Sequence, residues 1–200
     1  MKTRPYGINQ FHTHEILDTL WILTMHPRTH ELLDFLAEQR ALLRTAFDEV
    51  PAALRNAAPA PGQWSPAEII EHVSIANRRI AKLLSKKIAE AKSAGIGADA
   101  STEPVLPTID IPRMLDRARR FTAPEIVLPK GLRADIAWAE LERSTIAVRE
   151  AIAQGDGLAL SEIRYPHPLL GPLSLYAWIA LVGAHEGRHA QQIREVFSAH

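Results

Sequence analysis

The sequence of 200 residues contains no cysteine. This absence excludes a disulfide framework, zinc sites built on thiolates and a cysteine nucleophile, so any metal ion has to be held by histidine and carboxylate side chains. The chain also lacks an apolar run of about 18 residues, and its first residues are not typical of a secretory signal. We therefore expect a cytoplasmic protein without a membrane span.

An excess of charge of either sign is also missing, because 23 Lys and Arg residues balance 23 Asp and Glu residues. Without a basic surface to neutralise phosphates, nucleic-acid binding is disfavoured. Hydrophobic residues make up 46% of the chain, which is ordinary for a soluble globular protein. At this length one domain can bury an apolar core of its own.

Apolar residues recur at helical spacing in four segments, and this pattern predicts four long helices. They cover roughly residues 29–50, 66–94, 133–154 and 174–197. The start of the second helix is the best marked, since Ser65 is suited to cap it, Pro66 to open it and Glu68 to complete a capping box.

A long proline-rich connection separates the second and third predicted helices. Residues 95–130 contain five prolines, which predicts an irregular segment with one short helix over residues 113–121. We therefore expect an all-α fold, a four-helix bundle with a crossover, formed by residues 29–197. Residues 1–28 are expected to be a lead-in that holds at most a short helix.

The last predicted helix contains HEGRH, in which His185 and His189 lie one helical turn apart and Glu186 follows the first. Read literally, this is the H-E-x-x-H motif of zinc peptidases. Such a peptidase needs a third ligand downstream, but Glu195 faces away from the pair and His200 lies about 16 Å farther along the helix. A peptidase is therefore disfavoured, and the third ligand has to come from upstream.

His72 is the upstream candidate, because it lies on the otherwise apolar face of the second predicted helix. Across a bundle it would complete a three-histidine metal site with positions left for water, the arrangement of catalytic zinc. The alternative is that all three are core histidines bonded to neighbouring carbonyls or acids. The pair His26 and His30 flanks Pro27 at a helix start, and we expect it to be exposed.

Five other side chains are candidates for supporting roles. Gln192 and Glu68 lie near the ligand faces and are suited to orient an imidazole, although capping alone explains Glu68. Arg79 and Arg188 are candidate contacts for an anionic substrate, and the simpler interpretation is that both are solvated helix residues. Glu186 stays open between a general base, a residue that supports a ligand and a surface residue.

Three stretches carry a resemblance to a known family: GQWSPAEIIEHV, YPHPLLGPLSLYAWI and HEGRHAQQIREV. In these stretches, and in the order of the histidines, the chain resembles the DinB/YfiT-like superfamily of metal-dependent enzymes over roughly residues 29–197. The resemblance implies a bundle with an up-down-down-up path. It also implies a divalent metal ion on His72, His185 and His189, with zinc or nickel as the first candidates and iron or manganese as alternatives.

Members of that superfamily include S-transferases and isomerases that use low-molecular-weight thiols, and proteins named as metal-dependent hydrolases. The resemblance therefore implies a hydrolase or a thiol S-transferase that acts on a small electrophilic molecule. Because the chain has no cysteine, any thiol has to be a diffusible cosubstrate. The alternative is a metal-binding sensor or stress protein without catalysis. The resemblance also implies a homodimer.

Overall fold

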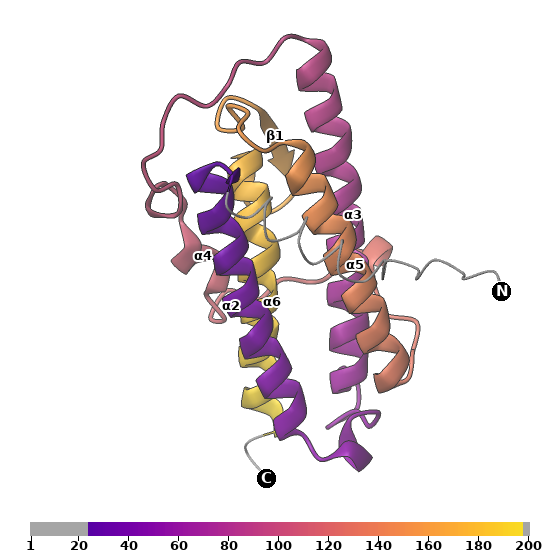
Figure 1. The fold of residues 1–200 in the computed structure, drawn as a ribbon. Helices are drawn as coiled ribbons and strands as arrows, with labels where there is room; N and C mark the ends of the chain where they lie inside the picture. The colour runs from indigo at the N-terminus through magenta and orange to yellow at the C-terminus, as the bar shows by residue number, and fades with distance from the viewer. Residues whose placement is uncertain (1–23, 198–200) are drawn as a thin grey trace, which may run out of the picture.

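Four long helices dominate the computed structural model, which describes residues 24–197 (Figure 1). They are α2 (Pro27–Glu49), α3 (Pro66–Ser93), α5 (Ala134–Gln154) and α6 (Leu175–Phe197). Helices α2 and α6 run in one direction, and α3 and α5 run in the other (Figure 1). This is the predicted four-helix bundle with its up-down-down-up path, and each helix begins and ends within two residues of its predicted bounds.

The predicted lead-in, residues 1–28, lies outside the described residues except for its last five. Within these five, α2 begins earlier than expected because His26 caps it. The Nδ1 atom of His26 accepts a hydrogen bond from the backbone N–H of Arg28 at 3.3 Å. Pro27 occupies the first helical position, where its lack of an N–H costs no hydrogen bond within the helix. The division into a lead-in and one bundle domain stays a prediction.

Helix α3 begins with the predicted capping box. The hydroxyl of Ser65 accepts a hydrogen bond from the backbone N–H of Glu68 at 3.2 Å, and the Glu68 carboxylate accepts one from the backbone N–H of Ser65 at 2.8 Å. The helix ends before Gly95, whose φ of +79° is a left-handed conformation that favours glycine. These local signals fix the register of the helix that carries His72.

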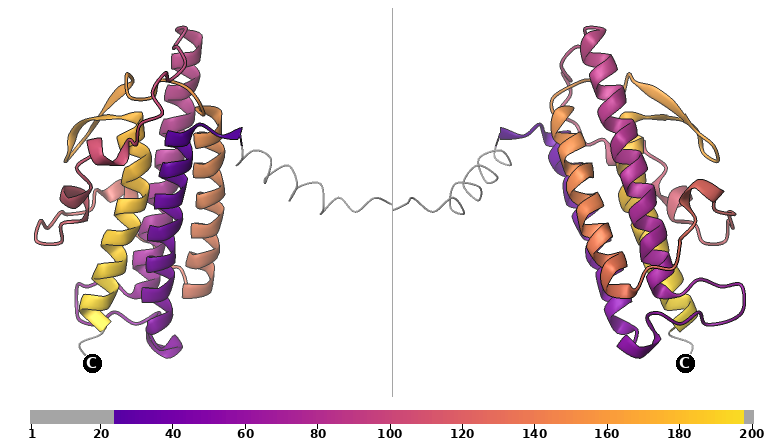
Figure 2. Two further views of the ribbon diagram at one scale, coloured as in Figure 1. Left: turned by 60° about the vertical axis from the view of Figure 1, so that its left-hand side comes forward. Right: turned by 90° about the vertical axis from the view of Figure 1, so that its right-hand side faces the viewer.

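The connection between α3 and α5 runs back along the length of the bundle, because these two helices point the same way (Figures 1 and 2). It contains the 3-10 helices η2 (Leu106–Thr108) and η3 (Glu125–Val127) and the short helix α4 (Ile111–Leu115). Helix α4 packs against α6, and η3 packs against α3. The connection therefore covers the side of the bundle where α3 and α6 meet.

The position predicted for the short helix, residues 113–121, is wrong. Helix α4 begins two residues earlier, because the Asp110 side chain caps it and Pro112 fits its first turn. It ends at Leu115, since Asp116 has left the helical region with ψ at 104°. The predicted stretch begins after Asp110 and Pro112 and therefore leaves out these two residues.

A two-stranded antiparallel hairpin, β1 (Arg164–His167) and β2 (Gly171–Ser174), leads into α6. The Nδ1 atom of His167 accepts hydrogen bonds from two backbone N–H groups of the turn, each at 3.2 Å. The indole N–H of Trp178 in α6 donates to a carbonyl oxygen of β1 at 3.0 Å. The hairpin is thereby fixed over the first turns of α6.

Two hydrophobic clusters make up the core, one at each end of the bundle. Between them, every long helix contributes buried or half-buried polar residues: Gln39, Arg40, Ser74, Asn77, Ser144, Glu186 and His189. This set, the polar layer, interrupts the apolar faces of all four helices at one level. Among the described residues, no helix has both the length and the apolar character needed to cross a membrane.

Candidate metal centre

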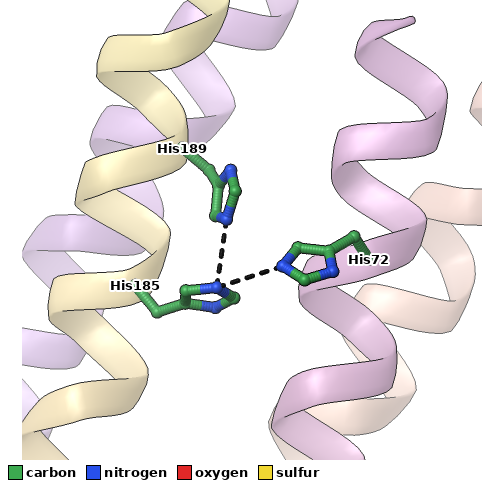
Figure 3. A group of neighbouring side chains, drawn as sticks. All are labelled: His72, His185 and His189. Carbon is green, nitrogen blue, oxygen red and sulfur yellow. Dashed lines mark hydrogen bonds between the residues drawn. The ribbon is translucent and has the colours of Figure 1, made fainter. Parts of the chain in front are cut away.

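Three histidines meet at the level of the polar layer, as Figure 3 shows. His72 comes from α3, and His185 and His189 come from consecutive turns of α6. The Nε2 atom of His185 lies 3.2 Å from that of His72 and 3.0 Å from that of His189. The structure thus brings together the three residues that the sequence singles out, in a group that can hold a metal ion.

Hydrogen bonds at the far side of two rings fix which nitrogen faces the group. The Nδ1 atom of His72 lies 2.8 Å from the carbonyl oxygen of Val127, and that of His189 lies 2.8 Å from Oε1 of Gln192. Both partners are oxygens that only accept, so each Nδ1 carries the proton. Each Nε2 therefore presents a lone pair to the centre of the group, as a metal ligand must.

The spacing of the nitrogens fits a tetrahedral ion. With metal–nitrogen bonds of about 2.0–2.1 Å, two ligand nitrogens on zinc lie about 3.3 Å apart, close to the 3.2 and 3.0 Å observed. Hydrogen bonds among the three rings satisfy the Nε2 atoms less well than a metal ion would. Because Nε2 of His72 and Nε2 of His189 both lack a proton, His185 can donate from its own Nε2 to one of them only.

The far nitrogen of His185 differs from those of its two neighbours. Its Nδ1 atom is buried and has no hydrogen-bond partner among the described residues. A His185 that donates from Nε2 would leave this Nδ1 as an unpaired acceptor, whereas a metal-bound Nε2 leaves it as an unpaired N–H. The alternative interpretation, core histidines bonded to neighbouring carbonyls, accounts for the contact between Nδ1 of His72 and the Val127 carbonyl. It does not explain why the three Nε2 atoms converge.

Burial keeps all three rings neutral. Loss of hydration, with a smaller contribution from the neighbouring His72, lowers the pKa of His185 to about 3. Burial is also the largest cause that lowers the pKa of His189 well below its ordinary value and that of His72 below 6.5. Neutral imidazole is the form that binds divalent metals, so the site is ready for an ion at neutral pH.

Glu186 does not face the three histidines. Its carboxylate lies in the polar layer, where Oε1 accepts a hydrogen bond from the Asn77 amide at 2.7 Å. Arg40 donates to both carboxylate oxygens, at 2.5 and 2.6 Å. Glu186 is 2% exposed, so the interpretation as a surface residue is wrong. With both oxygens engaged in an ion pair, it is a poor general base, which further disfavours a peptidase.

The candidate supporting residues lie as predicted except for Arg188. Gln192 contacts His189 as predicted, and Glu68 serves as a capping residue only. Arg79 is exposed, but Arg188 is only 8% exposed, so the prediction that both are solvated is wrong for Arg188. Its guanidinium donates to the carbonyl oxygens of Asp116 and Arg119 and fastens the connection to α6.

The second histidine pair takes no part in the centre. His26 caps α2 and is half-buried, so the prediction of an exposed pair is wrong for His26. His30 is exposed and lies 2.9 Å from the carboxylate of Asp34. Downstream of His189, Glu195 pairs with Arg117 at 2.9 Å, and His200 lies outside the described residues. No third ligand from the last turn of α6 approaches the group among the residues that are described.

Sequence reasoning missed two contacts of His72. The carbonyl oxygen of Val127 fixes its tautomer, and the Trp64 ring packs at 4.9 Å from it between centroids. The Val127 contact had no signal in the sequence, because a backbone oxygen is present at every residue. The Trp64 contact had one: the tryptophan directly precedes the cap of the helix that carries His72.

The fold and the site define a class: four-helix bundles in which three histidines from two helices form a group of the kind that binds a divalent metal. Within this class the chain belongs to the DinB superfamily, whose family profile matches residues 36–193.

Two individual proteins are similar to this chain. The uncharacterized protein YuaE of Bacillus subtilis (strain 168) is 24% identical over 147 residues, which are 70% of this chain and 82% of YuaE. The crystal structure of TT2238, a four-helix bundle protein, superposes with a TM-score of 0.57 at 19% identity. That similarity covers 84% of this chain and 98% of TT2238, and it supports the fold.

Proposed function

We propose that this protein is a metal-dependent enzyme, a hydrolase or a low-molecular-weight-thiol S-transferase that acts on a small electrophilic molecule. The observation that carries the proposal is the convergence of three histidine Nε2 atoms on one point, where hydrogen bonds at Nδ1 hold the rings of His72 and His189 in place. Three imidazoles leave at least one coordination position free. A bound divalent ion supplies a lowered pKa for a water or thiol at that position.

The chain's own residues would position the ion. His72, His185 and His189 would hold it, and Gln192 and the Val127 carbonyl would keep two of the rings in place. Zinc and nickel remain the first candidates for the ion, and iron and manganese the alternatives. The chain offers no thiol, so the S-transferase reaction requires a diffusible one.

The experiment is an activity screen with a matched pair of variants. Metal-loaded wild type is tested on small electrophiles with and without a diffusible thiol, beside His185→Ala and the control His30→Ala. We expect His185→Ala to lose metal and activity together, while His30→Ala keeps both because its ring is exposed and outside the group. Activity that persists in metal-free protein would refute the proposal.

One observation favours a second candidate, a metal-binding sensor or stress protein without catalysis. His72 and His189 are only 5% and 7% exposed, which restricts access to the ion. Cobalt in place of the native ion distinguishes the two functions through its visible spectrum. A spectrum that changes on adding a small thiol indicates a free coordination position and favours the enzyme, and an unchanged spectrum favours the non-catalytic function. The homodimer and the cytoplasmic location stay predictions, and sedimentation analysis would test the dimer.

A further inference from the structure

A cavity of about 310 Å³ lies beside the first turns of α6. Its walls come from residues 105–114 of the connection, from the β1–β2 hairpin and from Ala177 of α6. Figure 2 (left) shows the connection and the hairpin on the same side of this helix. The cavity is separate from the metal centre, because Ala177 precedes His185 by eight residues, about 12 Å along the helix.

The inner wall of this cavity is apolar and belongs to the core. Val105, Met114 and Ala177 are between 4% and 8% exposed, and the partly buried Leu170 and Leu173 pack against the same hydrophobic cluster. A wall of this kind keeps its shape without a ligand, and the volume is at the lower end of the range typical of small-molecule sites. An apolar group of a few carbons fits its chemistry.

The outer wall carries two arginines from different elements. Arg113 lies in α4 and Arg164 in β1, and neither guanidinium has a hydrogen bond or an ion pair with any described residue. The one acidic residue of the wall, Asp110, accepts a hydrogen bond from the backbone N–H of Arg113 at 3.1 Å. The wall thus holds two unpaired positive charges and one negative charge.

We propose that this cavity binds a small carboxylate with an apolar body. The two guanidiniums bind the carboxylate, since their planar donor geometry matches its oxygens. The apolar body covers the wall formed by Val105, Met114 and Ala177, and its removal from water adds to the affinity. The proposal does not depend on the metal ion or on the enzymatic function of the histidines.

The test is a titration of the full-length, metal-free protein followed by amide chemical shifts. Metal-free protein is used because a carboxylate can also bind a metal ion. The probes are hexanoate, hexanol with the same carbon chain but no charge, and inorganic phosphate with charge but no carbon chain. The variants are Arg113→Gln and Arg164→Gln, with Arg149→Gln as the control, an exposed and unpaired arginine on α5.

We expect hexanoate to bind saturably and to shift amides of residues 105–114 and of the first turn of α6. Each of the two cavity variants should weaken binding about fivefold, the upper end for a solvent-exposed ion pair, because both arginines are exposed, and Arg149→Gln should leave it unchanged. Hexanol or phosphate binding as tightly as hexanoate would overturn the assigned ligand class. Equal weakening by all three variants would overturn the assigned site, and so would the absence of saturation.

Discussion

Replacement of His72 by alanine tests the metal centre most directly. The change removes one of three nitrogens that converge within 4.8 Å of one another and leaves the α6 pair without a partner from α3. Loss of a residue that only supports a ligand costs about 10–100-fold in metal affinity, so loss of a ligand itself should cost at least about 100-fold. At a free metal concentration about 100 times the wild-type dissociation constant, binding stabilises the wild type by about 2.7 kcal/mol.

The same free metal concentration is about equal to the dissociation constant of the variant, so metal binding stabilises the variant by only about 0.4 kcal/mol. The difference of about 2.3 kcal/mol corresponds to a metal-induced rise in Tm that is about 5–9 °C smaller in the variant. The comparison uses the rise on adding metal, so any effect of the substitution on the metal-free fold cancels.

Two assays measure this prediction: thermal unfolding with and without the ion, and elemental analysis of extensively dialysed protein. Wild type and the control His30→Ala should retain about one ion per chain and show the full rise in Tm, because the ring of His30 is exposed and does not belong to the group. His72→Ala should retain little metal. The reasoning is refuted if the wild type keeps no ion, or if the variant keeps as much as the control.

The remaining predictions concern the surroundings of the centre. Gln192→Ala should weaken metal binding about 10–100-fold in a chelator competition, because the Nδ1–H of His189 loses its acceptor, and an unchanged affinity would contradict this role. Glu186→Ala should lower the free energy of unfolding by about 3–5 kcal/mol in urea, since Arg40 is left partly buried and unpaired. The surface variant Glu140→Ala should cost less than about 1 kcal/mol, and a similar cost for both would argue against a structural ion pair. Because the pKa of each of the three histidines lies below 6.5 in the folded state, their contribution to stability in metal-free protein is present above about pH 6.5. It should be lost as pH falls toward the folded pKa, by up to about 1.4 kcal/mol per histidine and pH unit, and urea midpoints that stay constant from about pH 7 to pH 5 would contradict it.

The helices of this fold could be predicted from the sequence because their signals are local. The capping box at Ser65 and the left-handed Gly95 lie within a few residues of the ends that they mark. The grouping of the histidines could also be predicted, since one helical turn places His185 and His189 on one face and a bundle brings a facing helix to them. These arguments need only the periodicity of a helix.

What could not be predicted depends on contacts between distant parts of the chain. In the sequence, Glu186 occupies the second position of a peptidase motif. Its ion-pair partner Arg40 is 146 residues away on another helix. Arg188 reads as a solvated helix residue, but the connection folds over it and two backbone carbonyls accept its hydrogen bonds. Such contacts and the Asp110 cap of α4 set the path of that connection. The spacing of apolar residues in the sequence does not reveal them.

The pairing of the helices has a consequence for the order in which the protein forms. The first described long helix, α2, packs mainly against the last, α6, and the middle helices α3 and α5 pack against each other. During synthesis α3 and α5 can associate early, whereas α2 has to wait until α6 has emerged. His72 and His185 are 113 residues apart, so the three histidines come together only after α6 has been made. An ion that needs all three histidines therefore binds only to chains that contain α6, because shorter nascent chains lack two of the three ligands.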